Sequence, residues 1–302
     1  MGTQKFLILV VGPTAVGKTS LCLNLANRYQ AGIVSCDSRQ FYREMNLGTA
    51  KPSPTELAAA PHYLINSRSI EEDYDVKQFE KEAIALLEKL FAQNGVVIMT
   101  GGSGLFADAV TEGFDEMPTI DPQIRQDIIN EYQAKGLVFL QKEVKNCDPV
   151  YFELVDQQNP QRLMRALEVY RGTGRPFSDF RVKQKINRPF DVIKIGLERP
   201  REELYERIES RMDVMIDTGL FDEAEGLFPK RHLNALQTLG YTEVFDFIEG
   251  KYDRAEAIRL LKRNSRHYAK RQLTWFKKDA DIRWFNPEND SDILIYLKDQ
   301  IG

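Results

Sequence analysis

Short apolar runs that end in glycine, proline or polar residues alternate with amphipathic segments in the first third of the chain. The run at 5–11 predicts a buried strand, because Gly12-Pro13 ends it abruptly. Further expected elements are a helix at 18–30, a strand at 31–36, a helix at 79–93 and a strand at 95–100. Strands alternating with helices are typical of a parallel sheet, which binds ligands at the carboxyl ends of its strands.

The pattern changes after residue 114. Helical segments are expected at 121–144 and 160–171, and there is almost no strand signal between residues 114 and 189. A strand is expected again at 191–197. Helices at 201–217, 220–228, 241–249 and 254–276 and a last strand at 282–285 complete the prediction. We therefore predict an α/β core formed by residues 1–114 and 189–302, an inserted all-helical subdomain at 115–188, and a helix-rich C-terminal part.

Composition is ordinary for a folded globular protein, with 302 residues, 42% of them hydrophobic and 28% charged. The longest apolar run, Phe6–Val11, is far shorter than the roughly 18 residues of a membrane span. The three cysteines are scattered and form no Cys-x-x-Cys pair, which argues against a disulfide framework or a zinc site. We therefore expect a monomeric cytoplasmic protein without a membrane segment.

Positive charge is concentrated in two segments, although the net charge is −4. Gln161–Arg188 holds eight Lys/Arg and two Asp/Glu, and Arg259–Lys278 holds eight Lys/Arg and no acid. Such segregation favours a polyanionic partner such as nucleic acid. Solvated faces of amphipathic helices are the alternative explanation.

Residues 12–19 form a complete phosphate-loop motif between a predicted strand and a predicted helix; they are Gly12, Pro13, Thr14, Ala15, Val16, Gly17, Lys18 and Thr19. The backbone N–H groups of such a loop bind phosphate oxygens at a helix N-terminus, Lys18 supplies a cation, and the Thr19 hydroxyl can hold Mg²⁺. The motif indicates a di- or triphosphate ligand without specifying a nucleotide. The chain has no Asn-Lys-x-Asp, and its one Asp-x-x-Gly, at 299–302, does not directly follow a predicted strand, which argues against a GTPase.

A strand ending at Asp37 could supply the magnesium-binding carboxylate of an ATP-dependent small-molecule kinase. The polar and aromatic residues that follow it, Ser38-Arg39-Gln40-Phe41-Tyr42, are unlike a purely metal-binding role. A non-enzymatic RNA-binding module switched by ATP is a third possibility.

Several further motifs accompany the phosphate loop in order along nearly the whole chain. They are Asp37-Ser38-Arg39-Gln40, Gly48-Thr49-Ala50-Lys51-Pro52, Gly101-Gly102-Ser103-Gly104, Asn159-Pro160-Gln161-Arg162-Leu163, Arg207-Ile208-x-x-Arg211, Gly240-Tyr241 and Ala269–Trp275. With them the chain resembles the bacterial tRNA dimethylallyltransferases. The resemblance implies transfer of a dimethylallyl group from its diphosphate to N6 of the adenosine immediately 3′ of a tRNA anticodon.

The resemblance also implies roles for individual residues. The phosphate loop would bind the donor diphosphate with Mg²⁺ on Thr19, and Lys18 and Arg211 would stabilise the leaving group. Asp37 would be the general base, with a magnesium ligand as its alternative role, and Arg211 could instead be a surface or tRNA-contacting arginine. Residues matching tRNA contacts are Asp37, Ser38, Arg39, Gln40, Ser103, Arg125, Gln161, Arg162, Leu163, Met164 and Arg165. The last six lie in the predicted insertion, which would contact the anticodon stem-loop.

Some positions depart from the family pattern; among them, Ser103 stands where Thr is usual and Phe106 where Tyr is usual. An isopentenyltransferase for free adenine nucleotides is the closest alternative. Such an enzyme would not need the basic Gln161–Arg188 segment, which therefore argues against it.

Overall fold

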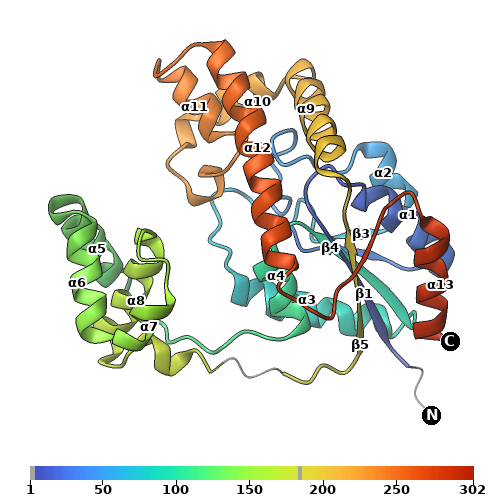
Figure 1. Cartoon of the computed structure of the whole chain (residues 1–302), viewed down its shortest axis with the longest axis horizontal. Coiled ribbons are helices and arrows are strands. Elements are labelled where there is room, and N and C mark those ends of the chain that lie inside the picture. The colour runs from blue at the N-terminus through green and yellow to red at the C-terminus, as the bar shows by residue number, and fades with distance from the viewer. Residues whose placement is uncertain (1–3, 183–185) are drawn as a thin grey trace. The chain divides into compact units, whose positions relative to one another are not determined.

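The computed structural model describes residues 4–182 and 186–302 (Figure 1). Lys183 and Lys185 of the first basic segment lie outside the described residues. The chain forms two compact units. One joins the residues up to Glu112 with those from Asn187 onward, and the other runs from Gly113 to Ile186. These bounds differ by two residues from the predicted insertion at 115–188.

The first unit is built on a six-stranded sheet in the order β3-β2-β4-β1-β5-β6, with every paired strand parallel. The strands are β1 (Phe6–Val11), β2 (Ile33–Ser35), β3 (His62–Tyr63), β4 (Val96–Gly101), β5 (Asp191–Leu197) and β6 (Arg283–Phe285). The strand β1 lies between β4 and β5, and all six of its residues are buried. A strand buried on both faces is expected to be continuously apolar, as the run at 5–11 is.

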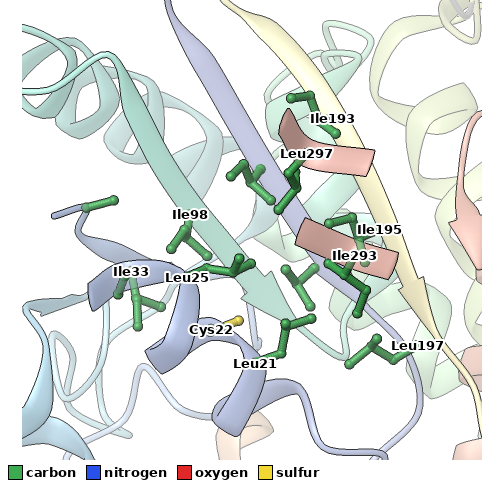
Figure 2. Close-up of a cluster of buried hydrophobic side chains, with 14 of the residues drawn as sticks. Leu21, Cys22, Leu25, Ile33, Ile98, Ile193, Ile195, Leu197, Ile293 and Leu297 are labelled. Atoms are coloured by element: carbon green, nitrogen blue, oxygen red, sulfur yellow. The ribbon is translucent and has the colours of Figure 1, made fainter. Parts of the chain in front are cut away.

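Successive side chains of β1 enter two separate hydrophobic clusters, because side chains alternate between the faces of a strand. Ile8 and Val10 join the cluster in Figure 2, which also contains Leu21, Leu25 and Ile195. Leu7, Leu9 and Val11 join the cluster on the opposite face. Helices α1 (Lys18–Tyr29) and α13 (Asp290–Ile301) supply residues to the first cluster, and α3 (Val76–Phe91) and α4 (Gly104–Thr111) to the second.

A third cluster lies among the helices of the C-terminal part. These helices are α9 (Arg201–Asp217), α10 (Leu220–Leu227), α11 (Thr242–Ile248) and α12 (Arg254–Phe276), with the short 3₁₀ helices η2 (Phe228–Lys230) and η3 (Asn234–Leu236) between them. Met45, which follows β2, is fully buried in this cluster beside Leu236 and Tyr241. The cluster therefore attaches the segment after β2 to the C-terminal helices. The remaining helix of this unit, α2, spans Pro54–Ala59.

All the regular secondary structure among the described residues of the second unit is helical. It contains α5 (Pro122–Lys135), α6 (Leu137–Cys147), α7 (Pro149–Leu154), α8 (Pro160–Thr173) and the 3₁₀ helix η1 (Phe177–Phe180). Ile128, Leu140 and Leu167 are buried in its own hydrophobic cluster. The helical segment predicted at 121–144 is two helices, because Gly136 adopts a positive φ of 75° between them.

The predicted fold class, an α/β protein with a parallel sheet, is confirmed. The elements α2, β3, α4, α7 and α13 were not predicted, and all but α13 are eight residues or shorter. Periodicity is weak evidence over so few residues. None of the described helices is long and apolar enough to cross a membrane.

Candidate active site

The phosphate loop connects the central strand β1 to α1. Gly12 has a φ of 146°, and a Cβ atom there would lie 2.6 Å from the carbonyl oxygen of Leu197 on β5. Gly17 has a φ of 118° at the N-cap of α1. Glycine is required at both positions, because only glycine adopts these conformations without strain and Gly12 has no room for a side chain. The loop thus begins the helix with its N-terminus facing a cavity.

Lys18 folds back along this loop. Its Nζ donates hydrogen bonds to the carbonyl oxygens of Gly12 (2.9 Å) and Pro13 (2.8 Å). Its pKa is lowered to about 8, mainly by burial; the carboxylate of Asp37 opposes this shift, and the charge of Arg211 adds to it. Three charged groups from distant parts of the sequence therefore interact at this site.

Asp37 follows β2, at the carboxyl edge of the sheet. Its Oδ1 accepts a hydrogen bond from the backbone N–H of Arg39 (3.0 Å), and its own N–H donates to Ser35 Oγ (3.3 Å). Beside it, Ser103 Oγ accepts from the N–H of Ser38 (3.0 Å) and donates to Ser38 Oγ (3.0 Å). The segments after β2 and β4 are therefore joined at the site, as expected for neighbouring parallel strands.

A cavity of about 1040 Å³ connects these groups. Its lining includes Thr14–Thr19, Asp37, Arg39, Gln40, Thr49, Ala50, Gly101, Gly102, Arg207, Arg211, Tyr268 and Gln272. Arg207 and Arg211 lie one turn apart on α9, where Arg207 Nε donates to the carbonyl oxygen of Ala15 (2.9 Å). The predicted Lys18, Asp37 and Arg211 are thus brought to one cavity large enough for a small organic diphosphate together with part of a nucleotide.

Gln272, on α12, is a residue of the site that had no role in the sequence-based prediction. Its side chain accepts a hydrogen bond from the N–H of Thr14 (2.8 Å) and donates one to the carbonyl oxygen of Gly102 (2.9 Å). It therefore bridges the phosphate loop and the loop after β4. The only sequence signal for Gln272 was its place in the Ala269–Trp275 motif.

A family model described as IPP transferase matches residues 40–279. The chain is also 49% identical over 295 residues to the tRNA dimethylallyltransferase of Cytophaga hutchinsonii, covering 98% of this chain and 97% of that protein. The chain belongs to the IPP transferase family.

Other members of the family are similar to this chain over nearly its full length. The tRNA dimethylallyltransferase of Flavobacterium psychrophilum is 49% identical, with 97% of each protein covered. The crystal structure of the full-length tRNA isopentenylpyrophosphate transferase from Bacillus halodurans superposes with a TM-score of 0.73 at 33% identity, covering 99% of this chain and 97% of that chain. A eukaryotic dimethylallyltransferase acting on tRNA has a TM-score of 0.75 at 24% identity, covering 93% of this chain and 74% of that chain, and supports the fold alone.

The side chains of two residues predicted to contact tRNA form hydrogen bonds within the protein. The guanidinium of Arg39 donates to the carbonyl oxygens of Asn234 (3.2 Å) and Ala235 (3.1 Å). The amide of Gln40 accepts from Ser35 Oγ (3.3 Å) and donates to the carbonyl oxygens of Thr49 and Ala50. The structure gives both side chains a role in holding the cavity wall, and contact with a nucleobase stays a prediction for them.

The predicted tRNA residues of the helical unit form a polar group on α5 and α8. Arg125 donates to Gln161 Oε1 (2.6 Å) and to Glu168 (3.2 Å), and Arg165 donates to the other oxygen of Glu168 (2.8 Å). Arg162 is exposed, and among the described residues its guanidinium has no hydrogen-bond or ion-pair partner. Arg162 is therefore the member of this group whose charge is available to an external anion.

Leu163 and Met164 lie on the opposite side of α8, with exposures of 0% and 2%. Their side chains pack in the core of the helical unit. Almost no part of either residue, main chain included, is exposed, so the tRNA contact predicted at these two positions stays a prediction. The helical period explains the difference, since residues next to each other in the motif point to different faces.

The second basic segment, Arg259–Lys278, lies on α12 and just after it, and it too contains both paired and unpaired cations. Acidic neighbours pair with four of its eight charges, namely Arg259 with Glu256, Lys262 with Asp213, Arg266 with Glu209 and Lys277 with Glu198. Lys270, Arg271 and Lys278 are exposed and form no ion pair with any described residue. Only part of the segment's charge is therefore available to a polyanion.

Thr19 lines the cavity from the first turn of α1, and no described residue forms a hydrogen bond with its hydroxyl group. The described residues contain no group of three or more His, Cys, Asp or Glu placed to hold a metal. One hydroxyl beside a phosphate loop fits a Mg²⁺ ion that takes most of its ligands from substrate phosphates and water. Thr19 and the phosphate loop therefore fit the predicted Mg²⁺ ion, whose presence stays a prediction.

Proposed function

We propose that this protein transfers a dimethylallyl group from dimethylallyl diphosphate to N6 of the adenosine immediately 3′ of the tRNA anticodon. The observation that carries the proposal is the convergence of Lys18, Arg211 and Asp37 on one cavity at the carboxyl edge of the sheet. Two cations beside a phosphate loop suit a diphosphate, and a carboxylate beside them suits an amine nucleophile. The relatives named as tRNA dimethylallyltransferases support the same reaction.

The reaction breaks the bond between the donor carbon and a diphosphate oxygen, which leaves with the bonding electron pair. Negative charge therefore grows on the diphosphate, where the loop N–H groups, Lys18 and Arg211 would stabilise it. Mg²⁺ on Thr19 would add a further positive charge to the diphosphate. The cavity limits water around these groups, which strengthens their electrostatic effect.

The N6 amine of adenine is a poor nucleophile, because its lone pair is delocalised into the ring. The new carbon–nitrogen bond forms as the N6 proton passes to a base, and the Asp37 carboxylate lies at the cavity to accept it. Asp37 Oδ1 is held by the N–H of Arg39, which orients the carboxyl group. The adenosine would have to leave the stack of the anticodon loop to reach Asp37.

Exposed cations on both units would bind the tRNA backbone. They are Arg162 on α8, Lys270 and Arg271 on α12, and Lys278 just after α12. Each contact with a phosphate releases counterions and makes binding salt-dependent. A tRNA substrate would place the reaction in the cytoplasm.

The proposal is tested by incubating the protein with radiolabelled dimethylallyl diphosphate and one of two acceptors. Label should enter unmodified tRNA and not AMP. Label entering AMP at a similar rate would indicate an isopentenyltransferase for free nucleotides, and label entering neither would refute the proposal.

Asp37→Asn separates the two roles of this residue. A general base predicts a fall in single-turnover rate of ~10²–10⁴ with tRNA binding little changed, because the amide keeps the shape but cannot accept the proton. Rescue of the rate by added Mg²⁺ would instead assign Asp37 to the metal. A rate within about threefold of wild type would remove Asp37 from the mechanism.

A further inference from the structure

The loop from Met45 to Lys51, here the 45–51 loop, supplies acceptors that hold two side chains of the cavity. The carbonyl oxygen of Ala50 accepts hydrogen bonds from Arg211 (2.9 Å) and from Gln40 (3.3 Å). Ala50 itself has a φ of 51°, in the left-handed region that residues with a Cβ rarely adopt. Such a conformation persists only where surrounding contacts determine it.

Glu223 on α10 supplies those contacts with both carboxylate oxygens. Oε2 accepts hydrogen bonds from the backbone N–H groups of Asn46 (3.1 Å) and Leu47 (3.0 Å). Oε1 accepts from the N–H of Gly48 (3.1 Å) and from the hydroxyl of Tyr241 (2.6 Å). Hydrogen bonds to an ionised acceptor are roughly twice as strong as neutral ones. One carboxylate therefore fixes three consecutive amides of the 45–51 loop.

Packing reinforces the same attachment. A Cβ atom on Gly48 would lie 2.4 Å from the ring of Tyr241, so glycine is required where the ring crosses the loop. Tyr241 is fully buried. Lys51 holds the other end of the loop by donating to the carbonyl oxygen of Tyr42 (2.5 Å) and to Asn66 Oδ1 (2.6 Å). The loop is thus held at both ends, with the acceptor carbonyl of Ala50 between them.

We infer that Glu223 is a positioning residue for the reaction, acting through the 45–51 loop to hold Arg211 in the cavity. The connection runs from the Glu223 carboxylate to the amides of residues 46–48, then to the carbonyl oxygen of Ala50, and from there to the guanidinium of Arg211. This inference rests on the proposed function. It also gives the Gly48–Pro52 and Gly240-Tyr241 motifs a shared role, which is to join the cavity wall to α10 and α11.

Glu223→Gln tests the inference, because it keeps the side-chain shape while removing the charge and one acceptor oxygen. The NH₂ group of the new glutamine would face N–H or O–H donors, with which it cannot form the hydrogen bonds that the carboxylate oxygen accepts. We expect kcat/KM for dimethylallyl diphosphate to fall at least about tenfold, since hydrogen bonds to a charged group are lost, while the KM for tRNA stays within about twofold. Glu225→Gln is the matched control, because Glu225 is exposed on the same helix and its side chain forms no hydrogen bond or ion pair with the described residues of the loop.

A double-mutant cycle distinguishes positioning from general loss of stability. If Glu223 acts through Arg211, Glu223→Gln should lower the transfer rate by less than about twofold in an Arg211→Gln background. Additive losses, or a Glu223→Gln variant as active as wild type, would overturn the inference. If Glu223→Gln fails to fold, Tyr241→Phe enters the same cycle, because it removes only one hydrogen bond to the carboxylate.

Amide hydrogen exchange separates this inference from the proposed function. In Glu223→Gln the peptides covering residues 46–51 should exchange faster than in Glu225→Gln, whatever reaction the protein catalyses. Unchanged exchange in these peptides would refute the attachment by Glu223. Absence of transfer by the wild-type protein would refute the proposed function and leave the exchange result standing.

Discussion

Raising the pH through 8 should weaken binding of the diphosphate donor, because it removes the charge of Lys18. Burial lowers the pKa of this lysine from 10.5 to about 8 in the folded protein. This shift corresponds to a destabilisation of the charged form, relative to the neutral form, by a free energy of about 3 kcal/mol. Since the charged form binds an anion, activity that depends on Lys18 should be lost as pH rises through the lowered pKa.

The size of the effect follows from the protonated fraction of the free enzyme. With a pKa of about 8, this fraction falls about 25-fold between pH 7.5 and 9.5, and kcat/KM for the donor should fall with it. A bound diphosphate stabilises the ammonium, so kcat at saturating donor should begin to fall only at higher pH. The assay is initial-rate transfer of dimethylallyl to saturating tRNA across this pH range.

Two variants identify the group responsible. Lys18→Arg keeps a cation that stays charged throughout the range, so its lower activity should lose the decline above pH 8. Lys51 also has a pKa lowered to about 8 by burial, and Lys51→Arg should leave the decline in place. A flat wild-type profile up to pH 9.5, or the same decline in Lys18→Arg, would refute the reasoning.

Three further outcomes are expected. Lys18→Ala should abolish transfer at every pH, because the leaving diphosphate loses a cation worth several kcal/mol in a site of low dielectric, and normal transfer would contradict the assignment of the phosphate loop. Arg162→Ala should raise the KM for tRNA and reduce the slope of log K against log salt by about one, whereas Arg165→Ala, whose guanidinium pairs with Glu168, should change the slope less. Leu140→Ala should lower the free energy of unfolding of the helical unit by about 2–5 kcal/mol in denaturant titrations, with Val138→Ala, exposed on the same helix, as the control near zero.

The sequence alone was sufficient for features that depend on neighbouring residues. The apolar run at 5–11, the glycines at 12 and 17 and Lys18 are consecutive, and their order predicted a strand, a phosphate loop and a helix start that the structure contains. The β5 bounds at 191–197 and the α12 bounds at 254–276 were also predicted. Parallel pairing follows from strands alternating with helices, because crossover connections bring strand ends to one edge. The sequence alone therefore places Asp37 at the same edge of the sheet as Lys18.

Only the tertiary structure decided which polar groups face the cavity and which face other parts of the protein. Gln40 and Arg39 belong to one motif, yet their side chains bind backbone carbonyls of segments about 10 and 195 residues away. Glu223 contacts the 45–51 loop across a sequence separation of more than 170 residues, and no local pattern signals such a contact. The physical reason is that buried hydrogen-bonding groups must find partners wherever the packed chain supplies them, and that supply depends on the whole fold.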